Sequence, residues 1–381
     1  MSRVNVFVLI DALGWELVAQ RPFLAQYLPH QQEVRTLLGY SSGIIPSILT
    51  GQTPAENGVW NLVYYDPARS PFRHMKHLGT LPGRLLDNRY GRRALTELGR
   101  RVLGLGSSFD VSVPPQTLPW FHWAEGRNIY ARQGIPGRRS IFDLLHERGV
   151  EHRIYSYKDP LTDAEILVRA EADITSGSGE FFFLYLSELD MFLHLNRHDP
   201  EKIAIKLEWY ERELGRVFAA AAARDPEAGL HVFSDHGMTP VVRHCDLAAE
   251  VESTGLGTPE DYLAVYDSTM ARFWFFSDDA RKKITERLRG LDYIQILSDD
   301  ELREFGVYFE DHRYGEVVAL LTPGSIVAEG GFNGSGWRPA GMHGYHPDDP
   351  YASAVYLSSA VPETKPKTVR EIFSIMQEAA R

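Results

Sequence analysis

The sequence predicts an α/β protein with a doubly wound, mostly parallel β-sheet and helices on both of its faces. Short apolar runs rich in β-branched residues, which are typical of buried parallel strands, recur along the chain. Longer stretches with a helical pattern lie between these runs. In addition, acidic or hydroxyl side chains follow several runs, and open α/β sheets bind their ligands at that edge.

The expected strands and helices alternate in the order that a parallel sheet requires. The first strand is the apolar run from Val4 to Ile10. Further core strands are expected at residues 34–38, 153–157, 181–186 and 230–233. Helices are expected at residues 13–28, 44–49, 141–147, 163–172 and 202–223.

A first stretch that breaks this alternation covers about residues 60–138. It is rich in Gly, Pro, Arg and aromatic residues, so we expect long loops there. Its aromatic side chains Trp120, Phe121 and Trp123 are more typical of loop packing than of a surface that stacks on bases.

A second stretch, residues 246–337, has a mixed α+β pattern with strand candidates at residues 271–276 and 317–321. We therefore expect a core formed by residues 1–245 and 338–381, with residues 246–337 inserted as a small cap. Because this segment separates the last two polar motifs of the chain, we expect it to fold over the functional site and to shape the substrate pocket.

Composition excludes several classes of protein. The 381 residues are 44% hydrophobic and 24% charged, which is ordinary for a globular protein with a sizeable core. A formal net charge of -11 without a basic stripe argues against binding to a nucleic-acid polymer. The single cysteine, Cys245, excludes an intramolecular disulfide framework and a cysteine-based zinc site.

The apolar run at the N-terminus is too short to span a membrane, and no small-residue cleavage site follows it. We therefore expect a cytoplasmic protein with no membrane span. The sequence does not indicate an oligomeric state.

Polar side chains follow four of the expected strands. Asp11 comes directly after the first strand, Ser41 lies just past the second, Asp190 follows residues 181–186, and Asp235 and His236 close residues 230–233. Any one of them alone would more often be a turn or helix-cap residue. Because the carboxyl ends of parallel strands meet at one edge, we expect these side chains to form a site.

Short motifs then carry a resemblance to a known family. The segment TGQTPAENG at residues 50–58 resembles the Thr-Gly-x-x-Pro-x-x-His-Gly segment of type I phosphodiesterases/nucleotide pyrophosphatases, in the alkaline phosphatase superfamily. SDHGM at 234–238, DMFLH at 190–194 and GMHGY at 341–345 are similar to motifs of that branch. The resemblance spans residues 4 to about 357 and implies an alkaline phosphatase-like core.

The resemblance implies a role for each motif. The nucleophile of the family lies nine residues before the Thr of the Thr-Gly segment, which is Ser41 here. One metal ion would be held by Asp11, Asp235 and His236 and would touch Ser41. The second ion would be held by Asp190, His194 and His343. Mixed carboxylate and imidazole ligands favour zinc, with manganese as the alternative.

The chemistry of the implied reaction explains these residue types. A phosphodiester is anionic and repels nucleophiles, so catalysis must neutralise charge and activate an oxygen. Two cations about 3.5–4 Å apart serve both needs. A serine hydroxyl becomes a strong nucleophile when a metal coordinates it, and the helix expected after Ser41 offers amide donors to a phosphoryl group. We expect hydrolysis of a small-molecule phosphodiester or pyrophosphate.

The sequence also departs from the family pattern. Ser41-Ser42-Gly43-Ile44 stands where the family usually has Thr-Phe-Pro-Asn, so the Asn that helps to hold phosphate is missing. Asn57 replaces the usual His before Gly58. Ser42 is an alternative nucleophile or a substrate-binding residue. The formylglycine run of sulfatases is broken, which makes sulfatase activity unexpected.

Two other functions remain open from the sequence. The same site would suit a phosphomonoesterase, a phosphonate hydrolase or a phospho-group transferase. A non-catalytic binding protein with a degenerate site is the alternative of another class. The complete set of six candidate ligands argues against degeneration, because drift normally erases some of them.

Overall fold

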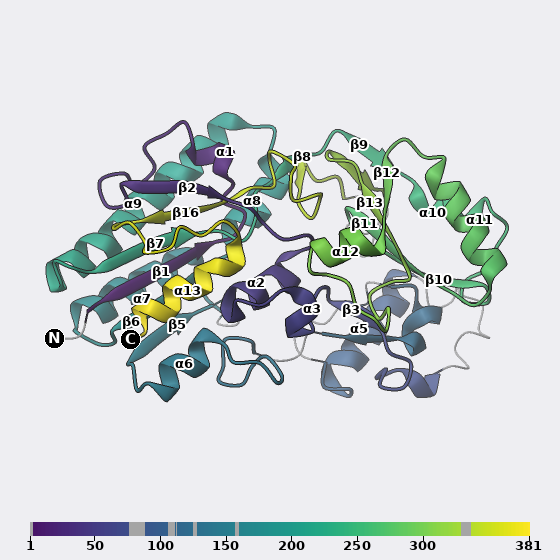
Figure 1. The fold of residues 1–381 in the computed structure, drawn as a ribbon, viewed down its shortest axis with the longest axis horizontal. Coiled ribbons are helices and arrows are strands. Elements are labelled where there is room, and N and C mark those ends of the chain that lie inside the picture. The colour runs from purple at the N-terminus through teal and green to yellow at the C-terminus, as the bar shows by residue number, and fades with distance from the viewer. Residues whose placement is uncertain are drawn as a thin grey trace.

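The computed structural model describes residues 3–75, 88–105, 111, 113–124, 128–156, 160–328 and 337–381 (Figure 1). Its larger sheet has six strands in the order β2-β16-β7-β1-β6-β5. The predicted fold class, a doubly wound and mostly parallel sheet between helices, is confirmed.

The most apolar strands lie at the centre of this sheet. β1 (Asn5–Ile10) pairs in parallel with β6 (Phe181–Leu186) and with β7 (Gly229–Phe233). β5 (His152–Tyr155) pairs in parallel with β6 at one edge. Every residue of β1 and β6 is buried, as expected for parallel strands that helices cover on both faces.

The other edge of the sheet is antiparallel. β16 (Ala354–Ser358) pairs antiparallel with β7, and β2 (His30–Val34) pairs antiparallel with β16. β2 has the sequence HQQEV, and only its last residue is buried. A short polar strand is suited to an edge because it discourages pairing with other chains.

Alternate side chains of β1 enter two separate hydrophobic cores. Val6, Val8 and Ile10 pack in a core with α7 (Asp163–Thr175) and α9 (Pro200–Arg224). Phe7 and Leu9 pack in a second core with α2 (Ser41–Thr50), α6 (Ile141–Glu147) and α13 (Ile372–Ala379), which follows η3 (Val369–Glu371). The sheet therefore lies between two helical layers (Figure 1).

Residues 246–328 contain a second sheet of four antiparallel strands in the order β10-β11-β13-β12. The strands are β10 (Tyr262–Tyr266), β11 (Met270–Phe275), β12 (Ile294–Leu297) and β13 (Val317–Leu321). Its helices are α10 (Leu247–Glu252), α11 (Asp278–Arg289) and α12 (Asp299–Glu304). The boundaries predicted for an inserted cap stay a prediction.

The stretch expected to form long loops contains regular elements. They are β3 (Val63–Tyr65), α5 (Arg89–Arg101), η2 (Pro115–Trp120) and β4 (Phe121–Trp123), and the short helix α3 (Pro54–Asn57) precedes the stretch. β3 and β4 pair antiparallel, and Phe121 and Trp123 pack in a core with Leu263 and Trp274 of the second sheet. The interpretation of these aromatic residues as packing residues is confirmed.

Short strand pairs join the segments around the second sheet. β8 (Thr239–Pro240) pairs antiparallel with β15 (Gly341–Met342), and β9 (Arg243–Cys245) pairs in parallel with β14 (Ser325–Val327). Within the described residues, no helix has both the length and the apolar composition needed to cross a lipid bilayer.

Two predicted elements are wrong in extent. The helix predicted at residues 13–28 ends after one turn, α1 (Trp15–Val18), because Pro22 follows and Leu24 adopts a φ of 52°. The strand predicted at 34–38 ends at Val34, and the chain then pairs with Thr368 instead of β16. Residues 35–40 therefore separate the strand from Ser41. Tyr157, the predicted end of β5, lies outside the described residues.

The N-terminus of helix α8 (Glu188–Asn196) is capped by a carboxylate from another helix. Ser187, the residue before α8, makes no side-chain cap. Asp163 on α7 instead accepts the backbone N–H groups of Ser187 at 3.0 Å and of Glu188 at 3.2 Å. Burial raises the pKa of Asp163 to about 6, although the hydroxyl of Tyr210 also donates to it. Asp163 thus fixes the start of the helix that carries Asp190.

We expect Asp163→Ala to lower the free energy of unfolding by about 1–3 kcal/mol, because two amides lose a buried acceptor. Chemical denaturation measures this change. The control is Asp199→Ala, which removes an exposed cap that accepts one amide, Lys202 N, at 3.1 Å and should cost about 1 kcal/mol or less. Equal losses in the two variants would contradict a special role for Asp163.

Candidate metal centre

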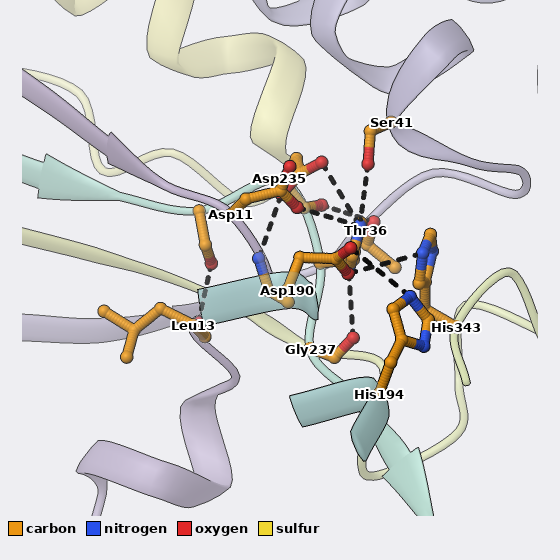
Figure 2. Close-up of polar contacts among 12 residues, drawn as sticks. Asp11, Leu13, Thr36, Ser41, Asp190, His194, Asp235, Gly237 and His343 are labelled. Carbon is orange, nitrogen blue, oxygen red and sulfur yellow. Dashed lines mark hydrogen bonds and ion pairs between the residues drawn. The ribbon is translucent and has the colours of Figure 1, made fainter. Parts of the chain in front are cut away.

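The carboxyl edge of the larger sheet brings the predicted site residues together (Figure 2). Asp11 directly follows β1, and Asp235 and His236 follow β7. Asp190 and His194 project from α8, which follows β6. His343 directly follows β15, and Ser41 begins α2. The ligand candidates are buried except Asp190 and Ser41, which are partly exposed.

The first group of side chains converges on one imidazole nitrogen. His236 Nε2 lies 2.9 Å from Ser41 Oγ, 3.3 Å from Asp235 Oδ2 and 3.4 Å from Asp11 Oδ1. The other ring nitrogen, Nδ1, lies 2.9 Å from the carbonyl oxygen of Gly237 and donates to it. Because Nδ1 is bonded to the backbone, Nε2 is the ring nitrogen that faces the serine and the two carboxylates.

The second group centres on Asp190. Its Oδ2 lies 3.3 Å from His194 Nε2, and its Oδ1 lies 3.6 Å from His343 Nε2. His194 Nδ1 donates to the carbonyl oxygen of Gly341 at 2.8 Å, which again turns Nε2 toward the carboxylate. The rings of His236 and His343 stack with centroids 3.7 Å apart, so the two groups adjoin.

Burial and the closeness of several carboxylates make the ionised form of this site costly unless a positive charge compensates it. Burial, together with the charges of Asp235 and Asp190, raises the pKa of Asp11 well above its ordinary value. Burial would also raise the pKa of Asp190, but the neighbouring His194 and His343 outweigh it and hold that pKa below its usual range. Burial and the charge of His236 hold the pKa of His343 well below its usual range.

Three carboxylate oxygens in the site have no hydrogen-bond partner among the residues that the structure describes. They are Asp11 Oδ1, Asp190 Oδ1 and Asp235 Oδ2, and each is buried. A buried anionic oxygen without a partner is costly, and a bound cation is one of the few ways to satisfy it. Asp11, Asp235 and His236 form one group with the spacing of metal ligands, and Asp190, His236 and His343 form another. The two groups share His236, and their carboxylate and imidazole donors are suited to divalent cations.

The same geometry disagrees with a serine–histidine–aspartate triad. In such a triad the serine and the aspartate bond to opposite nitrogens of the imidazole ring. Here Ser41 and both carboxylates face Nε2 of His236, and Nδ1 is bonded to a backbone carbonyl. An arrangement of three oxygens around one ring nitrogen is suited to sharing a cation.

Ser41 is the first residue of α2, and Tyr40 precedes it as the cap residue. The first amides of a helix have no intrahelical acceptor, so they face the space in front of Ser41. A Cβ atom on Gly43 would lie 2.2 Å from the carbonyl oxygen of Trp60, so only glycine allows this close approach. Ser42 Oγ is buried without a hydrogen-bond partner among the described residues.

The sequence did not indicate the residues that support the ligands. Tyr185, from the apolar run of β6, donates its hydroxyl to Asp11 Oδ2. The hydroxyl of Thr36 donates to the carbonyl oxygen of Asp235 at 2.6 Å. The one sequence signal that could have found Tyr185 is a hydroxyl within an otherwise apolar strand, and Thr36 carries no comparable signal. Such residues orient ligands and are often as necessary as the ligands themselves.

Comparison with known proteins gives the family. A family model described as type I phosphodiesterase / nucleotide pyrophosphatase matches residues 6–346. The chain belongs to this family. Membership, as the sequence motifs predicted, identifies it as an enzyme of the phosphodiester-hydrolase class. No curated protein matches the chain.

Solved structures of similar fold include ectonucleotide pyrophosphatase/phosphodiesterase 5 from mouse and human. The murine structure matches with a TM-score of 0.68 and 14% identity, and the human structure with 0.68 and 13%. An inactive murine variant in complex with AMP matches with a TM-score of 0.67 and 14% identity. Each alignment covers 100% of this chain and 95% of the other. At this identity, the likeness concerns the fold.

Asn57, which departs from the family pattern, has a structural role in this family member. Its side-chain Nδ2 donates to Ser47 Oγ at 3.0 Å, and its Oδ1 accepts the backbone N–H of Val59 at 2.9 Å. The residue therefore joins the end of α3 to α2. Gly51, with a φ of 73°, ends α2 and begins the short turn that leads to α3.

We expect purified, metal-replete protein to hold about two divalent ions per chain. Asp235→Asn should reduce this content to about one ion, because the first group loses a charged ligand. Elemental analysis after removal of free metal measures the content. The control is His152→Gln, since His152 on β5 bonds to the carbonyl oxygen of Val150 away from this edge. Fewer than one ion in the unaltered chain would contradict the assignment.

Proposed function

We propose that this family member hydrolyses a small-molecule phosphodiester or pyrophosphate with Ser41 as nucleophile and two divalent cations as cofactors. Zinc is the first candidate and manganese the second. One ion would be held by Asp11, Asp235, His236 and Ser41, and the other by Asp190, His194 and His343. The convergence of Ser41 Oγ and two carboxylates on His236 Nε2 carries the proposal.

When bound, the two cations would neutralise phosphate charge and lower the pKa of an oxygen nucleophile. Ser41 Oγ gives up its proton and forms a bond to phosphorus, and the bond from phosphorus to the leaving oxygen breaks. The leaving group takes up a proton. Water then attacks phosphorus, the bond to Ser41 Oγ breaks, and the serine hydroxyl is restored.

The start of α2 would orient the phosphoryl group during both steps. The unpartnered amides and the positive end of the helix dipole favour an anion in front of Ser41. Ser42 Oγ, which is buried on the same turn, would donate to a phosphoryl oxygen. This role would replace the Asn that the family usually has at residue 44.

AMP, bound by the inactive murine variant, makes nucleoside monophosphate esters the first substrates to test. The second candidate function is hydrolysis of phosphomonoesters or phosphonates, or group transfer, at the same site. Relative rates on bis-aryl and mono-aryl phosphates distinguish these reactions. A non-catalytic binding protein is the last alternative, and the presence of all six ligand candidates together with Ser41 argues against it.

We expect Ser41→Ala to lower the turnover of an activated diester by several orders of magnitude, because the covalent path is lost. Ser42→Ala should lower kcat only about tenfold, because one hydrogen bond to phosphate is lost. Both side chains are small and polar, so the fold and most of the metal content should survive in each variant. An active Ser41→Ala beside an inactive Ser42→Ala would mean that Ser42 is the nucleophile.

A further inference from the structure

We infer that Tyr40 and Thr269 form a hydrogen-bonded latch through which the second sheet positions both Ser41 and His343. Tyr40 directly precedes the proposed nucleophile, and Thr269 lies in the turn between β10 and β11. Both are positioning residues, because neither is a candidate metal ligand or nucleophile. The inference rests on the proposed function of the site.

The latch consists of three hydrogen bonds, two between Tyr40 and Thr269 and one from Thr269 to His343. The backbone N–H of Thr269 donates to the hydroxyl oxygen of Tyr40 at 3.0 Å. The hydroxyl of Thr269 donates to the carbonyl oxygen of His343 at 3.2 Å. The two hydroxyl oxygens lie 2.8 Å apart, and since the proton of Thr269 goes to His343, Tyr40 is the donor between them.

Each end of the latch is attached to a residue of the site. The carbonyl oxygen of Tyr40 accepts the N–H groups of Gly43 at 2.8 Å and of Ile44 at 3.0 Å, so its backbone begins α2. A rotation at Tyr40 would therefore turn the first residues of the helix, including Ser41. At the other end, the hydrogen bond from Thr269 restrains the peptide group of His343.

Packing leaves little room for this arrangement to shift. The rings of Tyr40 and His343 meet edge to face with centroids 5.6 Å apart. Gly344 has a φ of 92°, and a Cβ atom there would lie 2.7 Å from Tyr40 Cε1 and 2.8 Å from Thr269 Oγ1. Glycine at this position therefore allows the backbone after His343 to lie against both latch residues.

The second sheet holds Thr269 rigidly. Thr269 is fully buried, and its carbonyl oxygen accepts the N–H of Leu321 on β13 at 2.9 Å. In the same turn, Asp267 forms a buried ion pair with Arg272 at 2.9 Å. Asn61 Nδ2 also donates to Asp267 Oδ2, at 3.2 Å.

This ion pair provides a second connection to the nucleophile helix. Arg272 Nη1 donates to the carbonyl oxygen of Val63 at 2.8 Å, next to the segment whose Trp60 carbonyl approaches Gly43. Tyr40 and residues 60–63 thus join α2 to the same turn from two sides. The spacing of Ser41 from His343 therefore depends on the second sheet as well as on the larger one.

The test uses Tyr40→Phe in the full-length, metal-replete chain. The variant keeps the ring but loses the hydroxyl that joins Thr269. A misplaced group costs about tenfold to a hundredfold in rate, and loss of a residue that orients a ligand costs a similar factor in metal affinity. We therefore expect kcat to fall by about tenfold to a hundredfold with little change in KM. The dissociation constant of the more weakly bound metal ion should rise about tenfold.

A spectroscopic readout adds evidence that does not depend on turnover. In cobalt-substituted protein, the visible absorption bands should change in Tyr40→Phe, because Thr269, which holds the peptide group of His343, loses its hydrogen bonds to Tyr40. Thr269→Val keeps the shape of the side chain and removes the hydroxyl that lies between Tyr40 and His343, so it should change the same three measurements in the same direction. The double variant should be little worse than either single variant, because both remove one network.

The matched control is Tyr356→Phe, which removes another buried tyrosine hydroxyl. That hydroxyl lies 2.7 Å from Nδ1 of His231, and among the described residues no hydrogen bond joins it to a candidate ligand or to Ser41. This control should lose stability without a change in kcat, metal affinity or cobalt spectrum.

Three outcomes are distinguishable. Changed kcat, metal affinity and cobalt spectrum in Tyr40→Phe but not in Tyr356→Phe would support the latch. If Tyr40→Phe only loses stability, as the control does, the inference is wrong while the proposed function stands. If the unaltered chain neither binds the cations nor cleaves the diester, the proposed function is wrong and the inference with it.

Discussion

The crowding of three aspartates at one end of a buried sheet is the constraint on which the rest of the structure depends. Asp11, Asp190 and Asp235 have oxygens without hydrogen-bond partners in the described part of the chain. Holding like charges together away from water is costly, so rigid elements must prevent them from separating. The paired strands β1, β6 and β7 and the capped helix α8 supply that rigidity.

Hydroxyl groups of neighbouring residues also hold the crowded aspartates in place. Tyr185 donates to Asp11, and Thr36 holds the backbone of Asp235. Nδ1 of His194 and Nδ1 of His236 each donate to a backbone carbonyl, which turns both Nε2 atoms toward the carboxylates. Hydrogen bonds to the backbone and from hydroxyl groups thus orient the candidate ligands, as is typical of metal sites.

The sequence predicts the parts of this arrangement that depend on local pattern. β6 and α6 match their predicted ranges, and Asp11, Asp235 and His236 were placed at the sheet edge because they end apolar runs. The extent of α1 and β2 was wrong, because Pro22, the φ of Leu24 and the pairing of β2 with β16 decide it. Tyr40 and Thr269 could not be paired from the sequence, because 229 positions separate them and neither residue type signals a contact.

The position of β16 has a consequence for how the protein is made. This strand, close to the C-terminus, lies between β2 and β7, and His343 comes only shortly before it. A ribosome delivers the chain from its N-terminus, so β1, β6 and β7 emerge with one edge of the sheet still open. β8 can pair with β15 only after residues 241–340, which separate the two strands in the sequence, have been synthesised. Until then, the growing chain exposes an unpaired strand edge and has an incomplete set of candidate ligands. Because an unpaired edge favours aggregation, this is the stage at which chaperones would protect the chain most.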